Sequence, residues 1–74
     1  MFGFTMSKLI RSKATKRFLT TDGHWTAEVD NAERFFDQSL VSAAIHKFQL
    51  HDVELYYLFG EHGPSEYDFA ISLR

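Results

Sequence analysis

The fold is decided by residues 40–59, LVSAAIHKFQLHDVELYYLF, where one hydrophobic periodicity replaces another. In the first half, apolar side chains recur at the 3.6-residue spacing of a helix with one buried side. These residues are Leu40, Val41, Ala44, Ile45 and Phe48. Asp37 or Ser39 is suited to cap the helix N-terminus, and we expect the helix to end near Gln49 or Leu50. The spacing predicts one amphipathic helix.

The second half of this stretch has the two-residue alternation of a β-strand. Four alternating apolar residues are expected to face the helix: Val53, Leu55, Tyr57 and Phe59. The opposite face carries Glu54, Tyr56 and Leu58, so two of its three side chains are also apolar. A strand that is apolar on both faces is typical of the interior of a sheet with partial cover on each side.

The chain after residue 59 predicts a loop and a closing strand. Residues 60–66 contain Gly60, Gly63 and Pro64, which favour a loop. Residues 67–73 then alternate cleanly. The apolar set, expected to face the core, is Tyr67, Phe69, Ile71 and Leu73.

The chain before the helix predicts a first hairpin. Residues 8–12 and 16–20 have strand composition, and the short link 13–15 has the length of a hairpin turn. The Asp22-Gly23 pair predicts another turn. Residues 25–29 form either a short third strand or an extended connector, and residues 30–34 resemble one helical turn.

This order, β-β-(β)-α-β-β, predicts a two-layer α+β domain with one helix on an antiparallel sheet of about four strands. A chain of 74 residues is expected to form a single domain over 1–74, and its 45% hydrophobic content suffices for a core. Residues 1–6 are expected to be flexible, or the protein starts at Met6 instead of Met1. The strand order does not follow from the pattern.

Composition excludes several kinds of site. The chain has no cysteine, which rules out disulfides, thiolate metal sites and a cysteine nucleophile. No apolar run approaches the ~20 residues of a membrane-spanning helix, and no signal peptide is evident, so a cytoplasmic protein is expected. The histidines show no i, i+4 metal-binding pair. They are His24, His46, His51 and His62. We therefore predict no catalytic, metal-binding or cofactor-binding residue, and we do not expect an enzyme.

Apolar residues expected on the outer face of the sheet are the main candidates for an interaction surface. Tyr56 and Leu58, joined by Leu19 and Ala70, form either a protein interface or a face covered from within by spare aromatic residues. The spare aromatics are Phe2, Phe4, Phe35 and Phe36. Trp25 either closes one end of the core or offers an exposed stacking surface, and the small size of the chain favours the core.

Basic residues are concentrated in the first hairpin. They are Lys8, Arg11, Lys13, Lys16 and Arg17. The rest of the chain holds three cations and all ten acids, a balance of 3 − 10 = −7. Such an asymmetry is compatible with a nucleic-acid contact, although an ordinary solvated hairpin gives the same pattern and the acidic remainder would repel phosphates.

A resemblance extends over most of the chain from Arg17 onward. The segment RFLTTDGHWT, residues 17–26, followed by Ala32-Glu33-Arg34-Phe35, resembles a loose group of short, uncharacterised bacterial proteins with an fLT-DG-WT strand and turn before an A-x-x-F segment. The resemblance implies a bacterial origin and a ββαββ-like domain, and it brings no activity.

The sequence alone does not determine a function. The pattern favours a non-enzymatic module that binds another protein or its own copy, as a homodimer. The alternative is weak nucleic-acid binding through the basic hairpin.

Overall fold

The computed structural model describes residues 6–59 and 68–73. They form five strands, one 3-10 helix and one α-helix: β1 (Met6–Ser12), β2 (Phe18–Leu19), β3 (Trp25–Thr26), η1 (Val29–Asn31), α1 (Gln38–Phe48), β4 (Val53–Phe59) and β5 (Phe69–Ser72). The order of elements agrees with the expected β-β-(β)-α-β-β arrangement.

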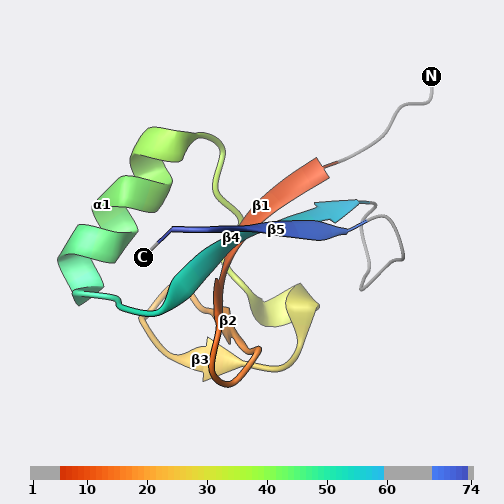
Figure 1. Cartoon of the computed structure of the whole chain (residues 1–74), viewed down its shortest axis with the longest axis horizontal. Helices are drawn as coiled ribbons and strands as arrows, with labels where there is room; N and C mark the ends of the chain where they lie inside the picture. Colours follow the sequence, from red (N-terminus) through yellow and green to blue (C-terminus); the bar gives the residue numbers. More distant parts are fainter. Residues whose placement is uncertain (1–5, 60–67, 74) are drawn as a thin grey trace.

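The strands form one antiparallel sheet in the order β3-β2-β1-β4-β5, with α1 packed against one face (Figure 1). The longest pairing joins β1 to β4, from Met6 opposite Phe59 to Ser12 opposite Val53. The predicted α+β class is confirmed. The sheet has five strands rather than about four, because the short segment Trp25–Thr26 does pair, with β2.

Helix α1 begins and ends where capping chemistry predicts. The carboxylate of Asp37 accepts hydrogen bonds from the backbone N–H groups of Ser39 and Leu40, at 3.1 and 3.2 Å. At the other end, Gln49 adopts a left-handed conformation with φ of 52°. These caps satisfy backbone groups that would otherwise lack partners within the helix.

The helix-facing core is close to the expected one. Buried residues of α1 pack against alternate residues of the sheet, and the cluster includes Val41, Ile45, Ile10, Val53 and Leu55. One prediction is wrong: Leu40 belongs to the apolar stripe but is 46% exposed. It lies in the first turn of α1, where it borders an open hollow at the surface instead of the sheet.

The outer face of the sheet is buried as well, by the segment that leads from β3 to α1. The cluster on this face consists of Leu9, Phe18, Val29, Ala32, Tyr56 and Leu58. Backbone hydrogen bonds fix the covering segment: the N–H of Glu33 donates to the carbonyl of Leu19, and the N–H of Phe35 donates to that of Lys8, both at 2.9 Å. The sheet is therefore sandwiched between α1 and η1 with its flanking residues.

Strand β5 departs from the prediction. Phe69 and Ile71 lie on the expected side of the sheet, opposite Tyr57 and Leu55 in the register, but they are 46% and 50% exposed. The physical reason is width. One helix is about 10 Å across and strands are about 4.8 Å apart, so a single helix covers roughly two strands. β5 is the edge strand and extends past that cover (Figure 1).

Some predictions concern residues outside the described ranges. These are the proposed flexibility of residues 1–5, the loop over 60–66, and the position of Tyr67. Met6 itself begins β1. Within the described residues, no helix is long and apolar enough to cross a membrane.

Candidate interaction surface

The residues expected to form an apolar interface on the outer face are buried within the chain. Tyr56 is 6% exposed, and Leu58 and Leu19 are 0% exposed. Val29 and Ala32 supply this cover. Of the aromatic residues expected to supply it, Phe35 belongs to the helix-side cluster and Phe36 is 89% exposed, while Phe2 and Phe4 lie outside the described residues. Phe18 pairs with Arg11 and therefore lies on the outer face of the sheet. Its neighbour Leu19 faces the other way and belongs to the helix-side cluster. These three residues do not form a surface.

Trp25 is not a core residue either. It lies in β3, the edge strand opposite to β5, where it pairs with Leu19 and keeps 37% of its surface exposed. The Asp22-Gly23 turn that precedes it does form, with a φ of 87° at Gly23. Trp25 therefore flanks the sheet at the end away from the apolar surface of β5.

A row of ionic contacts crosses the outer face of the sheet. The Nε of Arg11 lies 2.6 Å from a carboxylate oxygen of Glu54, and the Nζ of Lys16 lies 3.6 Å from the same oxygen. The side chains of Arg11 and Glu54 are only 22% and 12% exposed, whereas that of Lys16 is 59% exposed. The row neutralises a carboxylate that is mostly shielded from water.

Tyr56 continues this row toward β5. Its hydroxyl donates a 2.7 Å hydrogen bond to Asp68, whose other oxygen accepts a 2.8 Å bond from the backbone N–H of Phe59. The Tyr56 ring meets Phe18 edge to face at a centroid distance of 5.2 Å, and the guanidinium of Arg11 lies 4.5 Å from its centroid. Burial, followed by the hydrogen bond to Asp68 and its negative charge, raises the pKa of Tyr56 to about 12.

The raised pKa of Tyr56 predicts a loss of stability at alkaline pH. An unfolded tyrosine ionises near pH 10, so its contribution is fully present below that pH. It is lost as pH rises to about 12, because the unfolded state releases the proton first. We expect the free energy of unfolding to fall by about 2 kcal/mol more in the wild type than in Tyr56→Phe over this interval. Urea unfolding across the pH series measures the difference, and parallel curves would contradict it.

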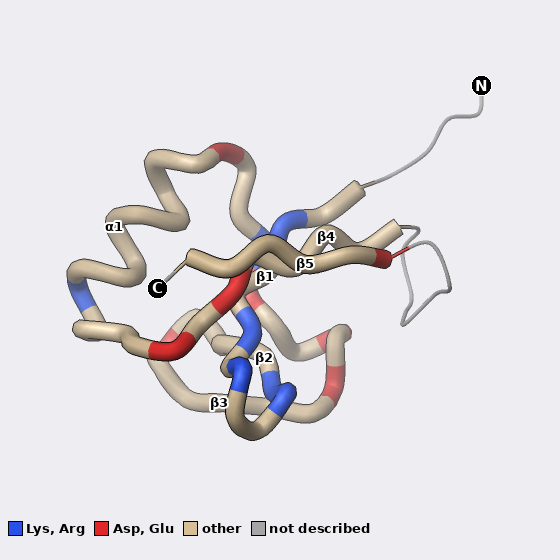
Figure 2. Tube along the Cα trace, in the orientation of Figure 1, with Lys and Arg blue, Asp and Glu red and all other residues tan. Residues whose placement is uncertain are grey.

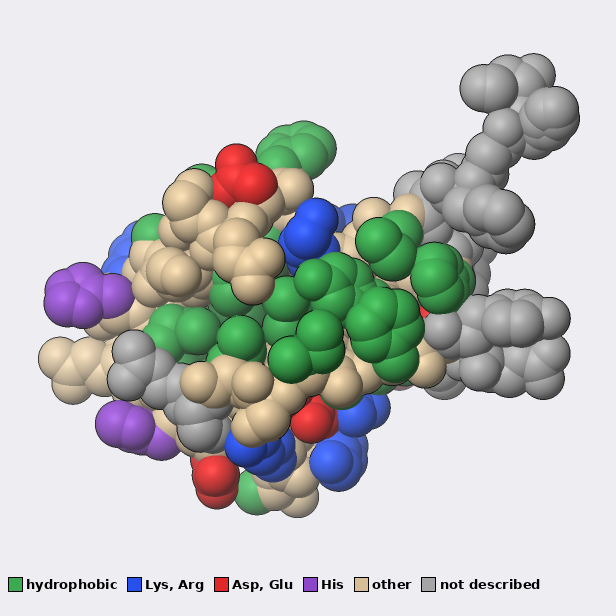
Figure 3. All heavy atoms as spheres, turned by 45° about the horizontal axis from the view of Figure 1, so that its top comes forward, with side chains coloured by type: hydrophobic (Ala, Val, Ile, Leu, Met, Phe, Trp, Pro, Cys, Tyr) green, Lys and Arg blue, Asp and Glu red, His purple; other side chains and the backbone are tan. Residues whose placement is uncertain are grey.

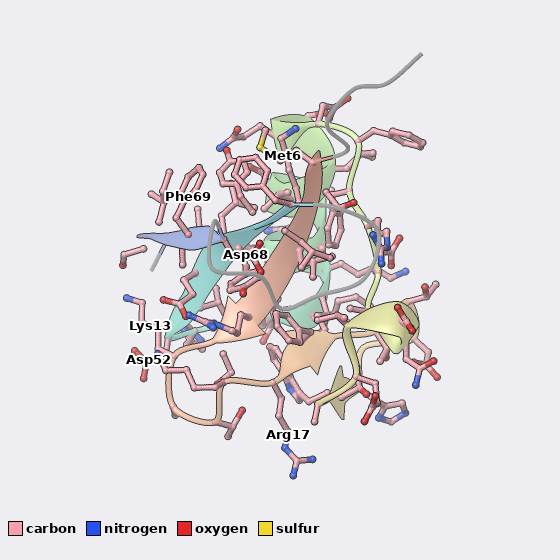
Figure 4. All side chains as sticks on the ribbon, turned by 90° about the vertical axis from the view of Figure 1, so that its right-hand side faces the viewer. Met6, Lys13, Arg17, Asp52, Asp68 and Phe69 are labelled. Atoms are coloured by element: carbon pink, nitrogen blue, oxygen red, sulfur yellow. The ribbon has the colours of Figure 1, made fainter. Side chains whose placement is uncertain are left out.

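The five basic residues of the hairpin do not gather on one face. Lys8 and Arg11 are three positions apart in β1, so their side chains lie on opposite faces of the sheet. Lys8 is on the helix side, where its Nζ is 3.4 Å from the carbonyl oxygen of Phe36. Lys13 donates to the hydroxyl of Ser72, and Arg17 extends from the hairpin into solvent (Figure 4). Figure 2 shows several Lys and Arg positions close together at the hairpin, with acidic positions beside them around the start of β4. This arrangement differs from a continuous basic surface.

The histidines within the described residues are dispersed. His24 is beside Asp22, at 4.0 Å, on an exposed turn. His46 and His51 border an open hollow at the C-terminal end of α1, and His62 lies outside the described ranges. No group of three or more potential metal ligands occurs among the described residues.

The most distinctive surface is an apolar area that begins at β5 and that we name the edge patch. It consists of Met6, Tyr57, Phe59, Phe69 and Ile71. Phe69 is its centre, with ring centroids 4.7 Å from Tyr57 and 6.2 Å from Phe59. Figure 3 shows hydrophobic side chains gathered on this side of the molecule, and Figure 4 shows Phe69 pointing outward from β5.

The edge patch was not predicted as a surface, because its members alternate in the same way as core residues. The sequence predicts which face of β5 is apolar, but exposure depends on the strand order and on the reach of the helix. The one available signal in the sequence was that more strands carry apolar residues on the helix side than a single helix can cover.

Comparisons with family models, curated proteins and solved structures give no match to this chain. The resemblance to a group of bacterial proteins therefore remains a prediction.

Proposed function

We propose that this chain is a non-enzymatic protein-interaction module that binds another polypeptide through the edge patch. The observation that supports the proposal is the half-exposure of Phe69, Ile71 and Met6 around a ring cluster that is itself only partly buried. Contiguous exposed apolar surface is costly in water and often marks a binding site on a small protein. A cytoplasmic setting suits a chain that contains no cysteine.

Nucleic-acid binding by the basic hairpin has weaker support. Arg11 and Lys16 share the carboxylate of Glu54, and Lys8 lies on the other face of the sheet from Arg11. Phosphate binding depends on cations that can act together on one backbone. Of the two aromatic residues near the hairpin, Phe18 is buried at 6% exposure and does not offer a face for base stacking, whereas Trp25 is 37% exposed.

Site-specific photo-crosslinking tests the proposed function. A benzoylphenylalanine at Phe69 is compared with the same residue at Phe36, which is 89% exposed and lies outside the edge patch. In cells of the native host, we expect discrete protein adducts from position 69 in several-fold higher yield than from position 36. Adducts in equal or lower yield at position 69 would overturn the proposal, because exposure alone favours Phe36.

A further inference from the structure

Among the described residues, β5 is the last strand of the sheet and pairs on one side only, with β4. The N–H of Leu73 donates to the carbonyl of Val53 at 3.1 Å, and the register continues through Ile71 opposite Leu55. In an antiparallel ladder, hydrogen-bonded pairs alternate with non-bonded pairs. Residues 69, 71 and 73 therefore bond to β4. The N–H and C=O groups of Ala70 and Ser72 point away from the sheet.

This edge lacks the features that usually block strand pairing. Sheet edges are normally protected by charge, proline, bulges or very short strands. Residues 69–72 are Phe-Ala-Ile-Ser, without charge or proline, and the pairing with β4 is unbroken over all four. The opposite edge of the sheet is protected by length, since β3 has only two residues.

We infer that β5 pairs antiparallel with β5 of a second copy of this chain, joining the two sheets into one. This inference rests on the proposed function and names the partner. The sequence of the strand is complementary to itself about Ile71. Ala70 then faces Ser72 of the second copy in a hydrogen-bonded pair, and Ser72 faces Ala70.

The side chains in this register fit on both faces. Ile71 opposes Ile71 of the second copy in a non-bonded pair, where side chains are closest. Phe69 opposes Leu73, so the helix-side face is apolar throughout. On the other face, the small side chains of Ala70 and Ser72 meet, and Lys13 of each copy contacts the hydroxyl of its own Ser72. No like charges are opposed within 69–73.

The area available indicates a weak dimer. Phe69 and Ile71 each leave about half of their surface in water, on the order of 100 Å² apiece. With the strand backbone, each copy contributes a few hundred Å², below the ~800 Å² per partner of a standard interface. Association is therefore expected at high micromolar protein and to be absent at low micromolar concentrations.

Analytical ultracentrifugation together with amide hydrogen exchange tests the inference. A weak but specific dimer has a Kd of up to about 1 mM. As the protein concentration rises toward that value, the average mass should increase from 8.6 kDa toward twice that value. Over the same range, exchange of the Ala70 and Ser72 amides should slow as the dimeric fraction grows, by about twofold once half of the chain is paired. The amides of residues 69 and 71, which bond to β4, serve as internal references.

Variants provide the matched comparison. Ile71→Lys places like charges opposite each other at the centre of the pairing and should weaken dimerisation at least tenfold. Leu40→Lys makes the same change at a similarly exposed apolar position, since Leu40 is 46% exposed and Ile71 is 50% exposed. This variant should leave the dimer affinity unchanged. The wild-type exchange measurement keeps the test valid if Ile71→Lys is poorly folded.

Two results would overturn the inference. One is a constant 8.6 kDa mass up to about 1 mM with fast-exchanging Ala70 and Ser72 amides. The other is association without protection of these amides, which would mean packing by faces rather than by edges. In both cases, photo-crosslinked adducts between position 69 and a different protein would still support the proposed interaction function. If position 69 also gives no such adducts, neither the edge pairing nor the interaction function stands.

Discussion

Replacing Leu58 with alanine is expected to destabilise the domain by about 3 kcal/mol. Leu58 is 0% exposed and lies in the outer-face cluster with Leu9 and Tyr56. Truncating a buried leucine costs about 2–5 kcal/mol, because the transfer free energy of the removed atoms is lost and a cavity remains. Stabilities of about 0.05–0.15 kcal/mol per residue give a domain of this size only ~4–11 kcal/mol. The loss is a large share of the total.

Leu40→Ala is the matched control for Leu58→Ala. Leu40 is 46% exposed on α1, so the same truncation should cost less than about 1 kcal/mol. Urea unfolding followed by tryptophan fluorescence or circular dichroism compares the two variants. If Leu58→Ala is no more destabilising than Leu40→Ala, the outer face is not a core, and the cover provided by Val29 and Ala32 is not stable in solution.

The parts of the fold that the sequence predicts are those set by local periodicity and capping. The stripe from Leu40 to Phe48 and a cap at Asp37 or Ser39 predict α1, because helix spacing and N-cap chemistry operate within a few residues. The alternation over Val53–Phe59 predicts β4 in the same way. A two-sided strand also indicates correctly that both faces of the sheet are covered in part.

What covers the outer face could not be predicted. The sequence predicts one helical turn over residues 30–34, and the structure has a three-residue 3-10 helix, Val29–Asn31, beside Ala32. So short a turn has no periodicity that indicates which surface it covers. The sequence therefore left Tyr56 and Leu58 as interface candidates, although they are internal. Conversely, Phe69 and Ile71 have the alternation of core residues and are half-exposed, because the position of β5 at the edge is a property of strand order.

The ionic row on the outer face predicts the second large effect. Arg11→Met should destabilise the domain by about 2 kcal/mol, because it leaves the shielded carboxylate of Glu54 without its closest partner. Methionine keeps an apolar stem over the ring of Tyr56, so the loss reports mainly the charge. Urea unfolding at neutral pH gives the value.

Lys16→Met is the matched control, since Lys16 contacts the same oxygen of Glu54. Its nitrogen is 3.6 Å away rather than 2.6 Å, and its side chain is 59% exposed against 22% for Arg11. Exposed pairs contribute about 0–1 kcal/mol, so the control should change little. A double-mutant cycle with Glu54→Gln should place most of the Arg11 effect in the pair. Equal losses for the two cations would mean that Glu54 is solvated and that the row is an ordinary surface feature, available to bind phosphate.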